Sequence, residues 1–152
     1  MSGRTPPRVL ILADDLIWST RLVGSVRAAG AEPVAVATSA AFEAALADVD
    51  RVLVDLTARG YDGCAEVERA ARAGRPVLCV GQHDDRELRR RAIAAGASRV
   101  LAYRRLHVDG PATIAAWLVR PERHRHLAPG PAPDRGPDPG RPAPAARKPA
   151  NR

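Results

Sequence analysis

The sequence contains few of the residues that mark secreted or membrane proteins. Its 152 residues include two cysteines, Cys64 and Cys79, which form no CxxC or other metal-ligand spacing. This cysteine usage does not indicate a disulfide framework and fits a reducing compartment. No apolar run approaches the roughly 20 residues needed to cross a bilayer, and the opening MSGRTPPR lacks the apolar core of a signal peptide. We therefore expect a cytoplasmic protein without membrane contact.

Lysine is nearly absent, because Lys148 is the single lysine among 24 basic residues. Residues 1–120 carry 17 basic and 14 acidic residues, a net charge of +3, and residues 121–152 carry seven and three, a net charge of +4. A weakly basic region followed by a short basic extension gives salt-sensitive, unspecific attraction to nucleic acid at best. We therefore expect no specific binding to nucleic acid.

Residues 121–152 differ in kind from the rest of the chain. They contain nine of the 14 prolines and almost no apolar residue besides alanine. Such a segment cannot bury enough apolar surface to offset the entropy lost on ordering. The sequence thus predicts an N-terminal arm (1–7), one domain (8–120) and a disordered Pro/Arg-rich tail (121–152).

Apolar runs and amphipathic segments alternate along residues 8–120. Five runs have the composition of strands that are buried on both faces, at 8–13, 32–38, 50–56, 75–81 and 98–103. Five segments with helical spacing of apolar residues follow them, at 14–30, 39–48, 62–74, 84–96 and 110–120. This alternation predicts an α/β fold with a five-stranded parallel sheet covered by helices on both faces. Right-handed crossovers favour a flavodoxin-like three-layer α/β/α arrangement with strand order 2-1-3-4-5.

Three local features refine this prediction. Thr38 or Ser39 is expected to cap the helix at 39–48. Asp84 stands three residues before Glu87, a spacing close to that of a capping box at the start of the helix at 84–96. Trp117 shares an apolar stripe with its neighbours on the last helix, and we expect it in the core.

Carboxylates follow two strands that the predicted order makes neighbours. Asp14 and Asp15 follow the first strand, and Asp55 ends the third. Ligands of such sheets bind beyond the carboxyl ends of the strands, where the strand order reverses. Three converging carboxylates favour a divalent cation, and a cation would let Asp55 act as a nucleophile toward a phosphoryl group. The alternative is that Asp14 or Asp15 caps the first helix and Asp55 is a solvated loop-entry acid.

The motifs VLILADD, VLVDL, RPVLCVG and AIAAGASRVL resemble the response-regulator receiver domains of bacterial two-component signalling, over about residues 8–119. The resemblance implies that Asp14 and Asp15 hold magnesium, which is the one cofactor that we expect. It also implies that Asp55 accepts a phosphoryl group from a histidine kinase.

The chain departs from the receiver pattern around the phosphoryl site. Receivers place Thr or Ser directly after strand 4, where this chain has Gly81, and an aromatic residue on strand 5, where it has Val100. They end strand 5 with a lysine followed by proline, and this chain has Tyr103 and Arg104. Arg104 lies one position late, which on a strand points its side chain to the other face. These departures predict a degenerate receiver, or pseudo-receiver.

His83 follows strand 4 at the same edge of the predicted sheet. It is a candidate ligand for a phosphate, a metal or a proton at the cleft rim, and the alternative is a loop histidine in water. A hydrolytic site built from His83 and Asp55 is the least supported hypothesis, because no oxyanion-binding Gly-rich loop or nucleophile elbow is present. We therefore expect no enzymatic activity.

Arg86, Arg89 and Arg90 lie on the helix predicted at 84–96. A run of charge on a helix is usually its solvated face, but the resemblance implies that helix 4, strand 5 and helix 5 contact partners or a second copy. We thus predict a stand-alone receiver-like signalling module that contacts a histidine kinase or another regulatory protein. The alternative is a phosphorylatable response regulator with Asp55 as magnesium-dependent phosphoacceptor.

Overall fold

The computed structural model describes residues 3–120, and the segment 121–152, predicted as a disordered tail, lies outside the described residues. Strands and helices alternate along the described part. Their bounds are β1 (Arg8–Leu12), α1 (Leu16–Ala28), β2 (Glu32–Val36), α2 (Ser39–Ala45), a 3₁₀ turn η1 (Leu46–Asp48), β3 (Arg51–Asp55), α3 (Gly63–Arg72), β4 (Val77–Gly81), α4 (Arg86–Ala95), β5 (Arg99–Ala102) and α5 (Tyr103–Leu118). None of the described helices is long and apolar enough to span a membrane.

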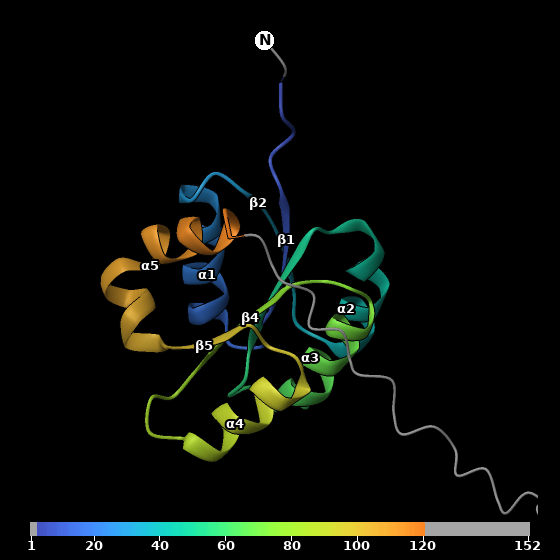
Figure 1. The fold of residues 1–152 in the computed structure, drawn as a ribbon, viewed down its shortest axis with the longest axis vertical. Coiled ribbons are helices and arrows are strands. Elements are labelled where there is room, and N and C mark those ends of the chain that lie inside the picture. Colours follow the sequence, from blue (N-terminus) through green and yellow to red (C-terminus); the bar gives the residue numbers. More distant parts are fainter. Residues whose placement is uncertain (1–2, 121–152) are drawn as a thin grey trace, which may run out of the picture.

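The five strands form one parallel sheet in the order β2-β1-β3-β4-β5. This order confirms the predicted flavodoxin-like α/β arrangement. Helices α1 and α5 cover one face of the sheet, and α2, α3 and α4 cover the other (Figure 1). The strand order reverses between β1 and β3, so the loops after these two strands meet at one edge of the sheet.

The two faces of the sheet bury separate apolar cores, because successive side chains of a strand point to opposite faces. Leu10 and Leu12 pack toward α2, α3 and α4, around the fully buried Phe42. Val9 and Ile11 pack toward α1 and α5. The sheet is therefore covered on both sides, as its continuous apolar strands predict.

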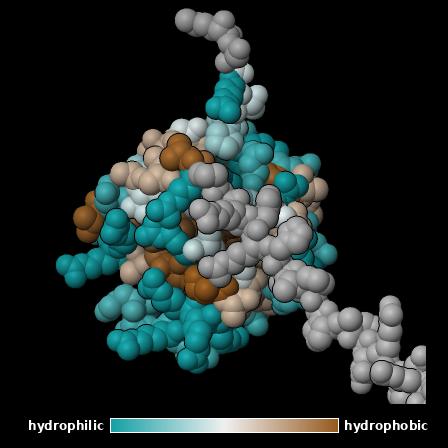
Figure 2. Space-filling view, viewed as in Figure 1, coloured by the Kyte–Doolittle hydropathy of each residue, from teal (hydrophilic) through white to brown (hydrophobic). Residues whose placement is uncertain are grey.

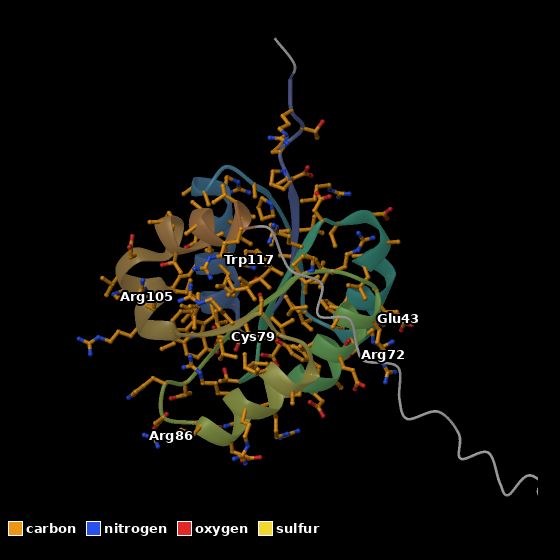
Figure 3. All side chains as sticks on the ribbon, viewed as in Figure 1. Glu43, Arg72, Cys79, Arg86, Arg105 and Trp117 are labelled. Atoms are coloured by element: carbon orange, nitrogen blue, oxygen red, sulfur yellow. The ribbon has the colours of Figure 1, made fainter. Side chains whose placement is uncertain are left out.

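The predicted core position of Trp117 is confirmed, because its side chain is 3% exposed. Cys79 is buried as well. In Figure 3 Trp117 and Cys79 lie in the interior of the fold, whereas Arg86 and Arg105 lie at its outer surface. Thr38 caps α2 by accepting a hydrogen bond from the backbone N–H of Ala41.

Two predicted element boundaries were wrong. The cap of α4 is Asp85, whose carboxylate accepts from the backbone N–H of Leu88, while Asp84 offers only its carbonyl to Arg86. Strand β5 ends at Ala102, and residues 103–108, expected outside the last helix, already form the first part of α5. A break at Asp109 (φ −150°, ψ 44°) separates this part from the predicted helix, which begins beside Pro111.

Candidate functional site

The ends of β1 and β3 open into a pocket of about 490 Å³ at the carboxyl edge of the sheet. Strands β1 and β3 pair directly, with Leu12 opposite Val54, so the residues after them are neighbours. The three predicted carboxylates all line this pocket. Its lining comprises Asp14, Asp15, Trp18, Asp55, Thr57, Arg59, Gln82 and Tyr103.

Asp55 is the most buried polar residue of this pocket, with 1% of its surface exposed. Its Oδ1 accepts hydrogen bonds from the backbone N–H of Thr57 at 3.0 Å and from the Thr57 hydroxyl at 2.9 Å. It also accepts from the hydroxyl of Tyr103. A buried carboxylate needs such donors in place of water, so Asp55 is not the solvated loop-entry acid of the alternative hypothesis.

Tyr103 reaches Asp55 from the first turn of α5 and not from the end of β5, where we expected it. Its ring stacks on Trp18 of α1, with 4.0 Å between ring centroids and 32° between ring planes. Its hydroxyl also contacts the Thr57 hydroxyl. Burial, and next the hydrogen bond to Asp55, raise the pKa of Tyr103 above its ordinary value. The phenol therefore keeps its proton at neutral pH and donates a hydrogen bond to the carboxylate.

The other two carboxylates of the pocket stabilise its walls. Asp15 is the N-cap of α1 and accepts from the backbone N–H of Trp18 at 2.9 Å. Asp14 Oδ2 accepts from the backbone N–H groups of Arg59 at 3.1 Å and Gly60 at 2.9 Å, which fastens the β3–α3 loop. Of the two predicted capping candidates, Asp15 is therefore the cap.

These hydrogen bonds bear on the predicted magnesium site. Asp14, Asp15 and Asp55 each offer oxygen, the ligand type that magnesium prefers. Within residues 3–120, however, no three His, Cys, Asp or Glu side chains are gathered closely enough to hold a metal ion. One oxygen of each carboxylate is already bonded to the protein. In this geometry the three carboxylates are held by hydrogen bonds to the protein and do not form a preassembled metal centre.

Tyr61 links β1 to β3 at the carboxyl ends of these strands. Its hydroxyl lies 3.0 Å from the carbonyl oxygen of Leu12 and 2.8 Å from that of Asp55. Burial, followed by the nearby charge of Asp55 and Asp14, raises the pKa of Tyr61 well above its ordinary value. The phenol thus keeps its single proton, which the carbonyl oxygens of the two strand ends share as acceptors.

The remaining predicted rim residues do not line the pocket. Gly81 is buried at the end of β4, and a Cβ there would meet the Leu56 side chain at 3.8 Å. His83 is exposed in the following loop, and its neighbour Gln82 lines the pocket instead. Arg104 is exposed in the first turn of α5, so the strand geometry that we used to orient its side chain does not apply.

The predicted partner residues Arg86, Arg89 and Arg90 are exposed on α4, and Arg90 pairs with Glu87 of the same helix. Figure 2 shows hydrophilic residues over the lower edge of the molecule, where Figure 1 places α4. This part of the surface is accessible to a partner.

Four residues of the pocket lining were missed from the sequence, namely Trp18, Thr57, Arg59 and Gln82. Asp55 accepts the N–H of the residue two positions on, as in an Asx turn. Any non-proline residue at position 57 could supply this N–H, so the sequence does not single out Thr57. Trp18 is a residue of α1. It is half-buried against Tyr103, a contact between elements 85 residues apart in sequence that no local pattern reveals.

The sequence matches no protein-family model and no curated protein. Its structure is similar to a putative response regulator from Chloroflexus aurantiacus, with a TM-score of 0.66 and 24% identity over 76% of this chain and 99% of that one. It is also similar to the chemotaxis response regulator CheY4 of Vibrio cholerae, with a TM-score of 0.60 and 21% identity over 75% and 97% of the two chains.

A third similar structure is a receiver domain of DrrB described as activated by BeF3, with a TM-score of 0.62 and 15% identity over 74% of this chain and 94% of that one. At these identities the likeness establishes the fold, and the chain adopts the fold of response-regulator receiver domains.

Proposed function

We propose that this chain is a receiver-like signalling module that acts through protein–protein contacts and that Asp55 does not serve as a working phosphoacceptor. The hydrogen bond from the Tyr103 hydroxyl to Asp55 carries this proposal. It engages Oδ1, the oxygen that Thr57 also contacts, and so holds one of the two carboxylate oxygens inside the pocket that an incoming phosphoryl group would have to enter. We further propose that the module catalyses no reaction of its own.

The charge of the pocket supports the same proposal. Its lining holds the three carboxylates, and Arg59 supplies positive charge there. A phosphodonor and the phosphoryl group it transfers are anionic, so the carboxylates repel them. Receivers offset this charge with a lysine and bind the phosphoryl oxygens with a hydroxyl after strand 4. Residues 1–120 contain no lysine, and Gly81 has no side chain.

The exposed arginines of α4 support a role in protein contacts. Arg86 and Arg89 are exposed, and arginine is enriched at protein interfaces because its guanidinium binds carboxylates through paired hydrogen bonds. We propose an acidic surface on a histidine kinase or another regulatory protein as the partner of this face. A second copy of the chain is the other candidate.

Intact mass spectrometry after incubation with magnesium and acetyl phosphate tests the proposal. We expect no phosphoryl adduct on the wild type or on Asp55→Asn. The matched control is the double variant Gly81→Thr/Tyr103→Lys, which restores both missing groups. A Cβ at position 81 makes ordinary contact with Leu56, at 3.8 Å. We expect an adduct on this variant that disappears when Asp55→Asn is added.

The alternative function, a phosphorylatable response regulator, is favoured by one observation. Asp55 ends β3 within a pocket that also contains Asp14 and Asp15, as the receiver pattern requires. An adduct on the wild type that is absent from Asp55→Asn would establish this alternative and contradict the proposal.

A further inference from the structure

Trp18 of α1 lines two neighbouring hollows of the surface. One is the acidic pocket around Asp55. The other is a groove of about 380 Å³ between α1 and α5, which Leu22, Leu106 and Pro111 also line. Trp18 is half-buried, so its indole lies between the two hollows rather than in the core.

Two side chains from the walls of these hollows contact the Trp18 indole. Tyr103 stacks on it from the pocket, with 4.0 Å between the ring centroids. The Arg21 guanidinium carbon lies 5.3 Å from the centre of the indole, within the range of a cation–π interaction. Arg21 Nη1 lies 2.9 Å from Nδ1 of His107, on the first part of α5. These contacts form one continuous chain from Asp55 to the groove.

The first part of α5 is held by its side-chain contacts and not by a helix cap. No side chain caps its start, because the N-cap is Ala102. The break at Asp109 separates it from the longer part of the helix that carries Trp117. Leu106 anchors it in the core, and the Tyr103 side chain is held by the Trp18 stack and by its hydroxyl contacts.

We propose that Trp18 is a positioning residue that holds the Tyr103 hydroxyl on Asp55, and that it links this hydrogen bond to the α1–α5 groove. The stack fixes the plane of the Tyr103 ring, and the hydroxyl follows the ring. A change in the groove that moves Trp18 therefore changes the hydrogen bond at Asp55. Because coupling between two sites is reciprocal, a change at Asp55 also alters the groove through Trp18. This inference rests on the Tyr103–Asp55 hydrogen bond of the proposed function.

The test is a double-mutant cycle that is read at neutral pH. The chain has two tyrosines, so labelling tyrosine with ¹³C at Cζ gives two NMR signals, and Tyr103→Phe identifies the signal of Tyr103. The measured quantity is the shift of this signal caused by Asp55→Asn. It is compared in the wild type, in Trp18→Phe, which keeps an aromatic ring, and in Trp18→Leu, which removes it.

We expect Asp55→Asn to shift the Tyr103 signal in the wild type and in Trp18→Phe, and the shift to be lost in Trp18→Leu. We also expect the His107 ring signals to move on Asp55→Asn only where an aromatic ring stands at position 18. Equal shifts of the Tyr103 signal in all three backgrounds would overturn the positioning role and leave the Tyr103–Asp55 bond intact. No shift even in the wild type would overturn both that bond and this inference.

Discussion

Three oxygen-bearing side chains determine what the end of β3 can do at the scale of single residues. Asp55, Thr57 and Tyr103 make three oxygen–oxygen contacts, but the two hydroxyl groups have one proton each. At most two of the contacts are therefore hydrogen bonds at once. The backbone N–H of Thr57 adds a further donor to Asp55. Oδ1 of the Asp55 carboxylate is thus satisfied within the protein, without a bound ligand.

The sequence was sufficient to predict the three acids but not this arrangement. Asp14, Asp15 and Asp55 could be placed at one edge because strand ends follow from apolar runs and strand order from the alternation of elements. The hydrogen bond from Tyr103 could not be predicted, because it depends on the direction in which α5 leaves β5 and on the contact of the Tyr103 ring with Trp18 of α1.

The raised pKa of Tyr103 predicts how its contribution to stability depends on pH. The folded protein retains the phenol proton at pH values where the unfolded chain has released it, so the contribution is complete below about pH 10. It is lost as the pH rises through the higher pKa of the folded state. Urea unfolding between pH 9 and pH 11.5, a range chosen around pH 10, should therefore show a smaller loss of unfolding free energy for Tyr103→Phe than for the wild type.

Tyr61→Phe is the companion variant, because burial raises the pKa of Tyr61 in the same direction. It should also flatten the alkaline loss of stability. Parallel pH profiles for the wild type and both variants would contradict the protonated, donating state that we assign to the two phenols.

At the scale of elements, the sequence predicted which segments form helices but not the residue at which each helix begins. Two adjacent aspartates precede α4, and only the second has the geometry to accept from the N–H three residues on. Residues 103–108 were missed because the start of α5 lacks a capping side chain and the sequence around Asp109 and Pro111 reads as a helix start. The part of α5 that carries Tyr103 therefore had no sequence signal of its own.

The cap of α4 can be tested with two neighbouring substitutions. Asp85→Ala removes the side-chain acceptor for the N–H of Leu88 and should lower the unfolding free energy by about 1 kcal/mol. Asp84→Ala is the matched control, since only the backbone carbonyl of Asp84 is used, and should change it by less than about 0.5 kcal/mol. Urea unfolding at pH 7 measures both. A larger loss for Asp84→Ala would show that the cap is misassigned.

At the scale of the whole molecule, the fold followed from the sequence because each strand is an apolar run and each is followed by an amphipathic segment. A sheet covered on both faces requires this pattern, and right-handed crossovers leave few strand orders. The site is assembled from the ends of β1 and β3 and the start of α5. Only the complete fold brings these segments together. The hydrogen bond from Tyr103 to Asp55, on which the proposed loss of phosphoacceptor function rests, therefore depends on the whole molecule.

Binding of beryllofluoride, a mimic of the phosphoryl group, in the presence of magnesium tests the central claim most directly, because it does not depend on the reactivity of a donor. Fluorine NMR of the wild type should show no protein-bound signal, since Tyr103 occupies Asp55 and no lysine or hydroxyl after β4 binds the mimic. Gly81→Thr/Tyr103→Lys, which supplies both groups, should show a bound signal. A bound signal on the wild type that disappears in Asp55→Asn would contradict the claim and identify Asp55 as a working acceptor.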